Sequence, residues 1–108
     1  METRDLRDDN GRLIGFTVSS LLGRHGVPQV LGRLPRATII RSQRRFALTG
    51  PDDFCEFTLG ERTFLVIEPF GDNSEFWIVA EPPELSQEFE AVRAAFGRHM
   101  VLGALYAG

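Results

Sequence analysis

Residues 54–67 read FCEFTLGERTFLVI and are the clearest structural signal in this chain of 108 residues. Two runs rich in aromatic and β-branched residues, Phe54 to Leu59 and Arg62 to Ile67, flank the dipeptide Gly60-Glu61. A two-residue connection that begins with glycine between two such runs is typical of a β-hairpin. The rest of the fold is therefore built outward from a hairpin in the second half of the chain.

The register of this hairpin gives one apolar face and a place for the only cysteine. Phe57 faces Phe64, and Cys55 faces Val66. A nucleophilic or redox-sensing cysteine needs a nearby histidine, cation or helix N-terminus to become a thiolate. The residues next to Cys55 in the strand offer none of these, so we predict a buried, chemically inert side chain.

Three more strands are predicted around the hairpin. Residues from Arg12 to Val18 alternate, which places Ile14, Phe16 and Val18 on one face. The short β-branched run Ala37 to Ile40 and the aromatic run Glu75 to Ala80 are the other two strands. The connection between the first two of these three strands is long enough for a crossover helix. This length permits, but does not require, a βαβ unit with parallel strands.

Two helical regions are predicted. Residues 19–34 form one broken region, in which Gly26 interrupts the chain and Pro28 suits a first helical position. Residues 84–97 form the second helix, and Gly97 follows its last turn as a C′ residue. Its apolar stripe has steps of four, three and four residues and consists of Leu85, Phe89, Val92 and Phe96.

The order strand, helix, four strands, helix predicts an α+β fold. We expect a mostly antiparallel sheet of about five strands with the helices packed on one face. Residues 1–11 are expected to form a flexible N-terminal arm, with a weak edge strand as the alternative, and residues 12–108 a single domain. A hydrophobic content of 43% and a charged content of 25% are ordinary for one globular domain of this size.

Composition also indicates a compartment. One cysteine allows no internal disulfide, the N-terminus is charged, and the longest apolar run is too short to span a bilayer. A cytoplasmic protein is therefore expected. All 12 basic residues are arginine, which is typical of a GC-rich, bacterial source. The net charge is +5 over residues 1–50 and −8 over residues 51–108.

Signals for catalysis, cofactors or metals are weak. His25 and His99 lack the spacing of a zinc or catalytic motif, no glycine-rich phosphate loop is present, and no lysine could serve one. We therefore expect no catalytic residue, cofactor or metal. An enzyme is the second alternative, with a site built from dispersed residues. Two carboxylates meeting in a cleft could catalyse hydrolysis, and the candidates beside strands are Glu56, Glu68, Glu75 and Glu81.

The acidic and aromatic segment from residue 68 to residue 77 predicts a protein-binding function. Aromatic residues on both sides of a polar turn can anchor an interface, and acids there can bind a basic partner. We interpret the chain as an adaptor, an inhibitor or an immunity-type protein. The uncharged residues 100–108 either dock on the sheet or pair with a second copy, so a homodimer is possible. The candidate contact residues are Glu68, Phe70, Asp72, Glu75 and Trp77.

The first alternative is a nucleic-acid accessory protein. Five arginines fall within thirteen positions and are followed by Phe46, a combination suited to phosphate contact and base stacking. The acidic balance of the whole chain opposes this interpretation, since it weakens long-range attraction to nucleic acid. The candidate residues are Arg33, Arg36, Arg41, Arg44 and Arg45.

Overall fold

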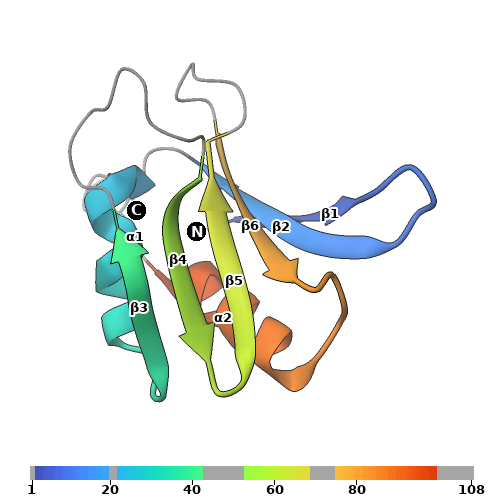
Figure 1. Cartoon of the computed structure of the whole chain (residues 1–108). Coiled ribbons are helices and arrows are strands. Elements are labelled where there is room, and N and C mark those ends of the chain that lie inside the picture. Colours follow the sequence, from blue (N-terminus) through green and yellow to red (C-terminus); the bar gives the residue numbers. More distant parts are fainter. Residues whose placement is uncertain (1, 20–21, 43–52, 69–74, 100–108) are drawn as a thin grey trace.

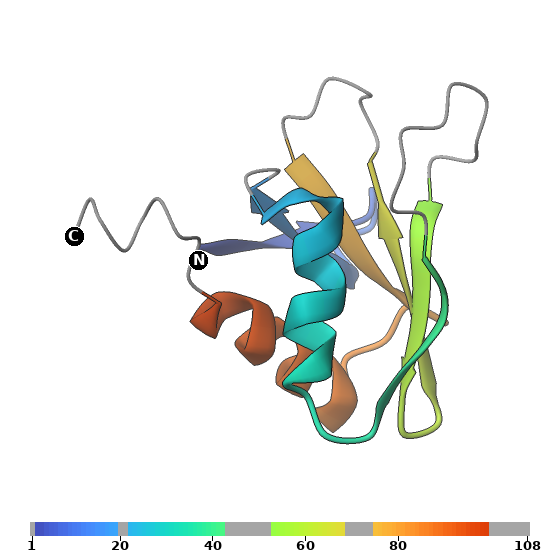
Figure 2. The same ribbon diagram turned by 90° about the vertical axis from the view of Figure 1, so that its left-hand side faces the viewer.

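The computed structural model describes residues 2–19, 22–42, 53–68 and 75–99, and in them an antiparallel sheet carries two helices on one of its faces (Figures 1 and 2). This confirms the α+β class, with six strands instead of about five. The strand order is β1-β2-β6-β5-β4-β3, and every neighbouring pair is antiparallel. The elements are β1 (Thr3–Arg7), β2 (Leu13–Ser19), α1 (Gly23–Gly32), β3 (Ala37–Ser42), β4 (Asp53–Leu59), β5 (Arg62–Ile67), β6 (Glu75–Glu81) and α2 (Gln87–Arg98).

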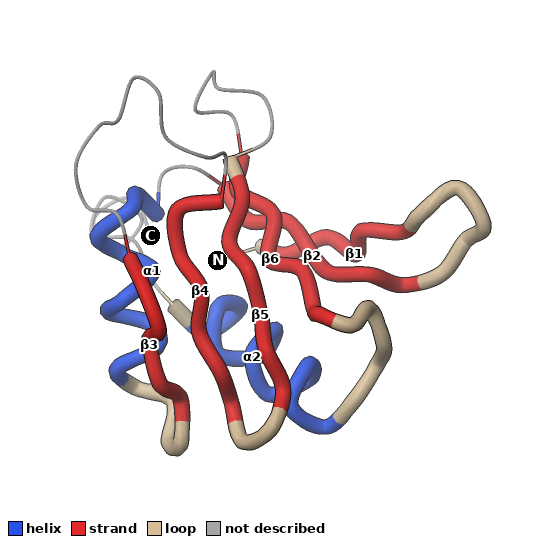
Figure 3. Tube along the Cα trace, in the orientation of Figure 1, coloured by secondary structure: helices blue, strands red, loops and turns tan. Residues whose placement is uncertain are grey.

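The predicted hairpin is confirmed in strands β4 and β5 (Figure 3). Phe57 pairs with Phe64 and Cys55 with Val66, which is the register expected from the turn. The two phenylalanine rings stack with centroids 5.2 Å apart. Gly60 opens the turn at φ +62°, a left-handed conformation that glycine adopts without steric cost.

The sixth strand, β1, lies in the region expected to be a flexible arm. Thr3–Arg7 pairs antiparallel with β2 as an edge strand, which is the alternative that the sequence left open. Asp5 points to the helical side of the sheet and accepts a hydrogen bond of 2.6 Å from Arg93 of α2. This ion pair joins the first strand to the last helix, and no local sequence pattern predicts such a long-range contact.

The sequence left open whether the strands on either side of α1, β2 and β3, are parallel neighbours. Since every neighbouring pair in the sheet is antiparallel, β2 and β3 run in the same direction. They do not pair, because β6, β5 and β4 lie between them. The βαβ connection therefore spans the sheet instead of joining neighbouring strands.

Both helices differ in detail from their predicted form. Helix α1 is continuous from Gly23 to Gly32, so Gly26 does not interrupt it and Pro28 lies inside it. A Cβ at the buried Gly26 would lie 2.6 Å from Leu22 Cδ1, so a larger residue there would require the Leu22 side chain to move.

Helix α2 begins later than its apolar spacing predicts. The Ser86 hydroxyl accepts a hydrogen bond of 3.0 Å from the Phe89 backbone N–H, which caps the helix at that point. Leu85 therefore lies before the helix and is 57% exposed, outside the buried stripe. At the other end Gly97 lies within the helix, which ends at Arg98.

The core lies between the helices and the face of the sheet that they cover. Phe16 of β2 meets the rings of Phe89 and Phe96 of α2 edge-on, at centroid distances of 5.9 and 5.7 Å. Cys55 is fully buried in the same cluster, as predicted. The face of the sheet that points toward the helices is called the inner face below, and the opposite one the outer face.

Candidate protein-binding surface

The outer face of the sheet changes character from one strand to the next. In β4 the inward residues Cys55 and Phe57 are apolar, and the outward residues Glu56 and Thr58 are polar. Such alternation is the ordinary pattern of a sheet that has one face in solvent. Strands β5 and β6 break this pattern, since their central residues are apolar on both faces and only Thr63, Glu75 and Glu81 are polar on the outward side.

Four outward residues of β5 and β6 form two cross-strand pairs on this face. Leu65 pairs with Val79, and Ile67 pairs with Trp77. Each of the four is only partly buried, whereas the alternating residues in the same strands are in the core. Neither helix covers this side of the sheet (Figure 2).

A bulge adds Ile14 to the same surface. The register of β1 with β2 passes from Leu6 opposite Gly15 to Arg7 opposite Leu13, so Ile14 has no opposite residue. The bulge reverses the alternation at this point. Leu13 packs against the core and Ile14 faces outward, which corrects the prediction that Ile14 shares the face of Phe16 and Val18.

These outward side chains form a shallow hollow of about 360 Å³, which we call the apolar pocket. Its wall comes from β2, β5, β6 and the segment that follows β6, and among the described residues Glu81 contributes its only carboxylate. Single apolar residues scattered over a surface are common in proteins, whereas a contiguous apolar surface of this kind is typical of a binding site. The lining residues are Ile14, Leu65, Ile67, Trp77, Val79, Ala80, Glu81 and Pro83.

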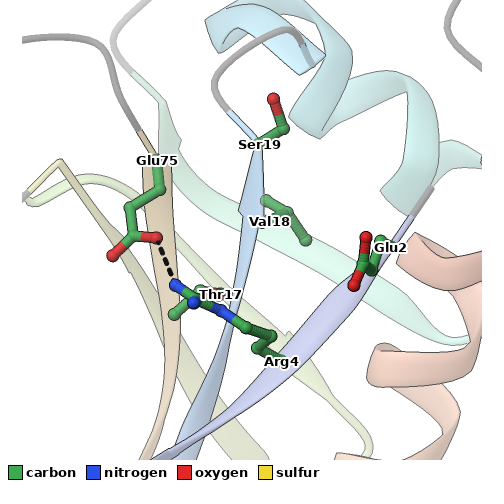
Figure 4. A pocket seen from close by; sticks show the side chains of 6 residues that line it. All are labelled: Glu2, Arg4, Thr17, Val18, Ser19 and Glu75. Carbon is green, nitrogen blue, oxygen red and sulfur yellow. Dashed lines mark hydrogen bonds and ion pairs between the residues drawn. The ribbon is translucent and has the colours of Figure 1, made fainter.

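Trp77 is held in place by a short network of polar contacts. Its indole N–H donates to Glu75 Oε1 at 2.9 Å, and Arg4 donates to the other carboxylate oxygen at 3.1 Å. Figure 4 shows Arg4 reaching from β1 across β2 to Glu75 on β6. Both oxygens of Glu75 are therefore engaged, which fixes the ring of Trp77 at the edge of the apolar pocket.

A second, polar pocket of about 290 Å³ lies over β1, β2 and β6 and is lined by this network (Figure 4). Thr17 forms its base and is 7% exposed. Glu2 and Glu75 bring two carboxylates to this pocket, but Arg4 is already bonded to the second. The pocket extends the outer surface with hydrogen-bonding groups beside an apolar centre, which is the composition of protein interfaces.

Sequence reasoning found part of this surface. Glu75 and Trp77 are in direct contact, and Glu68 follows Ile67, the residue that pairs with Trp77. Phe70 and Asp72 lie outside the described residues. The sequence-based prediction missed Ile14, Leu65, Ile67 and Val79. The signal for the last three was the unbroken apolar runs of β5 and β6, which are typical of strands covered on both faces, whereas Ile14 reaches this surface through the bulge in β2.

The arginines proposed for nucleic-acid contact are only partly described. Arg33 follows α1 and Arg36 precedes β3, and both are exposed. The backbone of Arg36 has a φ of +72°. Arg41 belongs to β3, although its side chain lies outside the description, as do Arg44 and Arg45 altogether.

The described residues hold no group of three or more His, Cys, Asp and Glu side chains that could bind a metal ion. His99 is the C-cap residue that follows α2 and is 8% exposed. Its burial, with the nearby Arg33 guanidinium, lowers its pKa from the usual 6.5. The side chain of His25 lies outside the description. Of the four carboxylates considered for hydrolysis, Glu81 lines the apolar pocket and Glu75 the polar one.

Comparisons with known proteins give no relative from which a function could be transferred. No protein-family model matches the chain, and neither a curated protein nor a solved structure matches it. Among the described residues no helix is long and apolar enough to cross a membrane.

Proposed function

We propose that this protein acts by binding another protein, and that the outer face of its sheet around the apolar pocket is the contact surface. The observation that carries the proposal is the pattern of β5 and β6, whose central residues are apolar on both faces while the described helices cover only one face. Strands with this pattern usually have a layer on each side. A bound partner would supply the layer that the described part of the chain does not provide.

Two features of the pocket support a protein as the ligand. Its shallow shape and apolar wall suit side chains of another protein surface better than a small polar metabolite. Trp77, a residue type enriched among interface anchors, stands at the edge with its indole N–H already bonded to Glu75. A rigid aromatic side chain loses little entropy when a partner packs against it.

The test is affinity capture from a lysate of the source organism with the wild-type protein and two variants. Val79→Lys places a charge in the apolar pocket, whereas Thr58→Lys places the same charge on β4, on the same face outside the pocket. Both sites are partly buried. We expect the wild type and Thr58→Lys to retain the same partner and Val79→Lys to lose it.

Folding must be preserved for the comparison to count. Loss of a partly buried valine costs about 1 kcal/mol, which lowers the melting temperature of a domain of this size by about 4–8 °C. Both variants should therefore remain folded at 25 °C. Equal capture of a partner by all three proteins would contradict the assignment of this surface, and the absence of any captured protein would contradict a protein-binding function.

A further inference from the structure

Independently of the proposed function, we propose that the β3 edge of the sheet is a second interaction surface and that its partner is a second copy of this chain. The two β3 strands would pair antiparallel about a two-fold axis. The inference rests on three observations, which are an edge that no described strand covers, isoleucines exposed along it, and a register in which the strand is complementary to itself.

The two edges of the sheet differ in the side chains that they expose. Strands β1 and β3 end the strand order at opposite sides, so each has one row of backbone groups that no described strand pairs with (Figure 1). The exposed residues of β1 are Arg4, Asp5 and Arg7, and all of them are charged. Charge along an edge strand opposes pairing with another chain. Strand β1 is therefore the protected edge of this sheet.

Strand β3 lacks this protection in its described side chains. Thr38, Ile39 and Ile40 are exposed, and none of them carries a charge. Ile39 is 38% exposed and Ile40 is 56% exposed, which makes them two of the three exposed large apolar residues in the described part of the chain. Unpaired backbone groups beside exposed β-branched side chains are the features to which another strand adds.

The two isoleucines lie on opposite sides of the strand. Ile39 pairs with Phe57, an inward residue of β4, and so points to the inner side. Ile40 is the next residue and points to the outer side. A helix packed on one face covers only one of them, whereas a strand added in the plane of the sheet packs beside both. The occupant that this edge fits is therefore an extended strand.

The sequence of β3 suits a second copy as that strand. With the two-fold axis at Ile39, this residue lies opposite its own copy and Thr38 lies opposite Ile40. Both pairs match β-branched side chains, which favour one another across strands. Arg41 would lie opposite Ala37, so no charge meets its own copy in this register. The bulge at Ile40 ends the regular pairing and keeps the interface short.

A head-to-tail arrangement of copies is disfavoured. Pairing β3 of one copy with β1 of the next would place charged residues of β1 beside the exposed isoleucines, and it would leave a free edge at each end for further copies. The two-fold pairing uses both β3 edges and closes the assembly as a dimer. Its axis is perpendicular to the sheet, so both copies would turn their apolar pockets to the same side.

The test is sedimentation equilibrium of the purified protein between about 10 and about 500 μM. A strand of six residues buries less area than a standard interface of about 1,600 Å², so we expect a dimer with a Kd in the micromolar range. The mean mass should rise with concentration from the monomer value of 12.1 kDa toward twice that value. A mass that stays at the monomer value over the whole range would overturn the inference.

Opposite charges at position 39 test the register. Ile39→Lys and Ile39→Glu each place like charges opposite one another on the axis, so each variant alone should dimerise at least about tenfold more weakly than wild type. An equimolar mixture of the two places Lys opposite Glu and should dimerise within about threefold of wild type. Leu85→Lys, at an exposed apolar residue before α2, is the matched control and should dimerise like wild type.

A second pair of variants retains Ile39 and replaces the first pair if circular dichroism shows that a charge at that position unfolds the protein. Thr38→Glu combined with Ile40→Lys places opposite charges across the axis and should retain dimerisation. Thr38→Lys combined with Ile40→Lys places like charges there and should lose it. Both sites are exposed, so both double variants should remain folded.

The outcomes decide the inference without deciding the proposed function. Loss of the dimer in each charge variant, with recovery in the mixture, supports pairing of two β3 edges. Dimers that persist in both charge variants, or a mixture that stays monomeric, overturn it. A monomeric wild type that captures a protein which Ile40→Lys loses would assign the edge to a strand of that protein and would overturn the dimer. Capture through the apolar pocket is judged separately, by Val79→Lys.

Discussion

The two faces of the sheet carry similar side chains and differ in what covers them. On the inner face Phe16, Phe57 and Phe64 are at most 1% exposed beneath the two helices. On the outer face Leu65 and Trp77 are equally apolar but only partly buried, with no helix above them. Apolar side chains alone therefore do not identify a core. Whether other elements of the chain cover the face decides whether it is a packing surface or a candidate binding surface.

Strand β4 provides a comparison within the same sheet. Its outward residues, Glu56 and Thr58, are polar, so its outer side is suited to solvent. Its neighbour β5 presents Leu65 and Ile67 on the same side. The change between adjacent strands limits the apolar surface to one part of the sheet, as expected for a site of defined extent rather than for a generally apolar protein.

The largest expected effect contrasts two adjacent residues of β5. Phe64→Ala should reduce the free energy of unfolding by about 3–5 kcal/mol, because it leaves a cavity in the covered core. Leu65→Ala, on the outer face, should reduce it by about 1 kcal/mol, because much of the side chain is already in contact with solvent. Urea unfolding of both variants measures the difference.

A domain of this size has a total stability of about 5–15 kcal/mol, and at the lower end of this range Phe64→Ala leaves too little native protein to measure. Phe64→Leu, which should cost about 1–2 kcal/mol, then replaces it, and Leu65→Gln becomes its partner. Equal losses at positions 64 and 65 would mean that the outer face stabilises the isolated chain as much as the core does, which would contradict the distinction between the two faces.

A smaller effect is expected at His99, a buried histidine that follows α2. The pKa of His99 is lowered in the folded protein by burial and by the Arg33 guanidinium. Above pH 7.5 the imidazole is neutral in both states and contributes nothing to pH dependence. As the pH falls through 6.5, the unfolded chain takes up a proton that the folded protein resists, so stability decreases.

His99→Gln should remove this part of the pH dependence. The midpoint of urea unfolding, measured at pH 7.5 and pH 5.5, should decrease more for the wild type than for the variant, with His25 present in both. Parallel decreases in the two proteins would show that His99 does not titrate in a buried environment.

Local patterns in the sequence predicted the hairpin, the α+β class and the burial of Cys55. These follow from side-chain alternation and turn chemistry, which act over a few residues. The strand β1 was left open because its pairing with β2 and the contact of Asp5 with Arg93 are long-range. The start of α2 was misplaced because Leu85 continues the helical spacing, whereas the Ser86 cap determines where the helix begins.

The candidate surface was less accessible to sequence reasoning. The segment around Trp77 and Glu75 was identified from its composition, but which residues accompany it depends on strand order. Ile14 reaches the outer face through a bulge that reverses its predicted direction. Leu65 and Val79 were placed in strands without a face, because a continuous apolar run does not reveal which of its two faces the protein covers.

The fluorescence of Trp77 tests the central claim most directly, since it is the only tryptophan in the chain and lines the apolar pocket. The measurement is acrylamide quenching of the free protein and of its complex with a tryptophan-free binding segment of the captured partner. Binding at the outer face predicts a lower quenching constant and emission at shorter wavelength in the complex. Quenching and emission that stay unchanged at saturating partner would show that the partner binds elsewhere and would contradict the account.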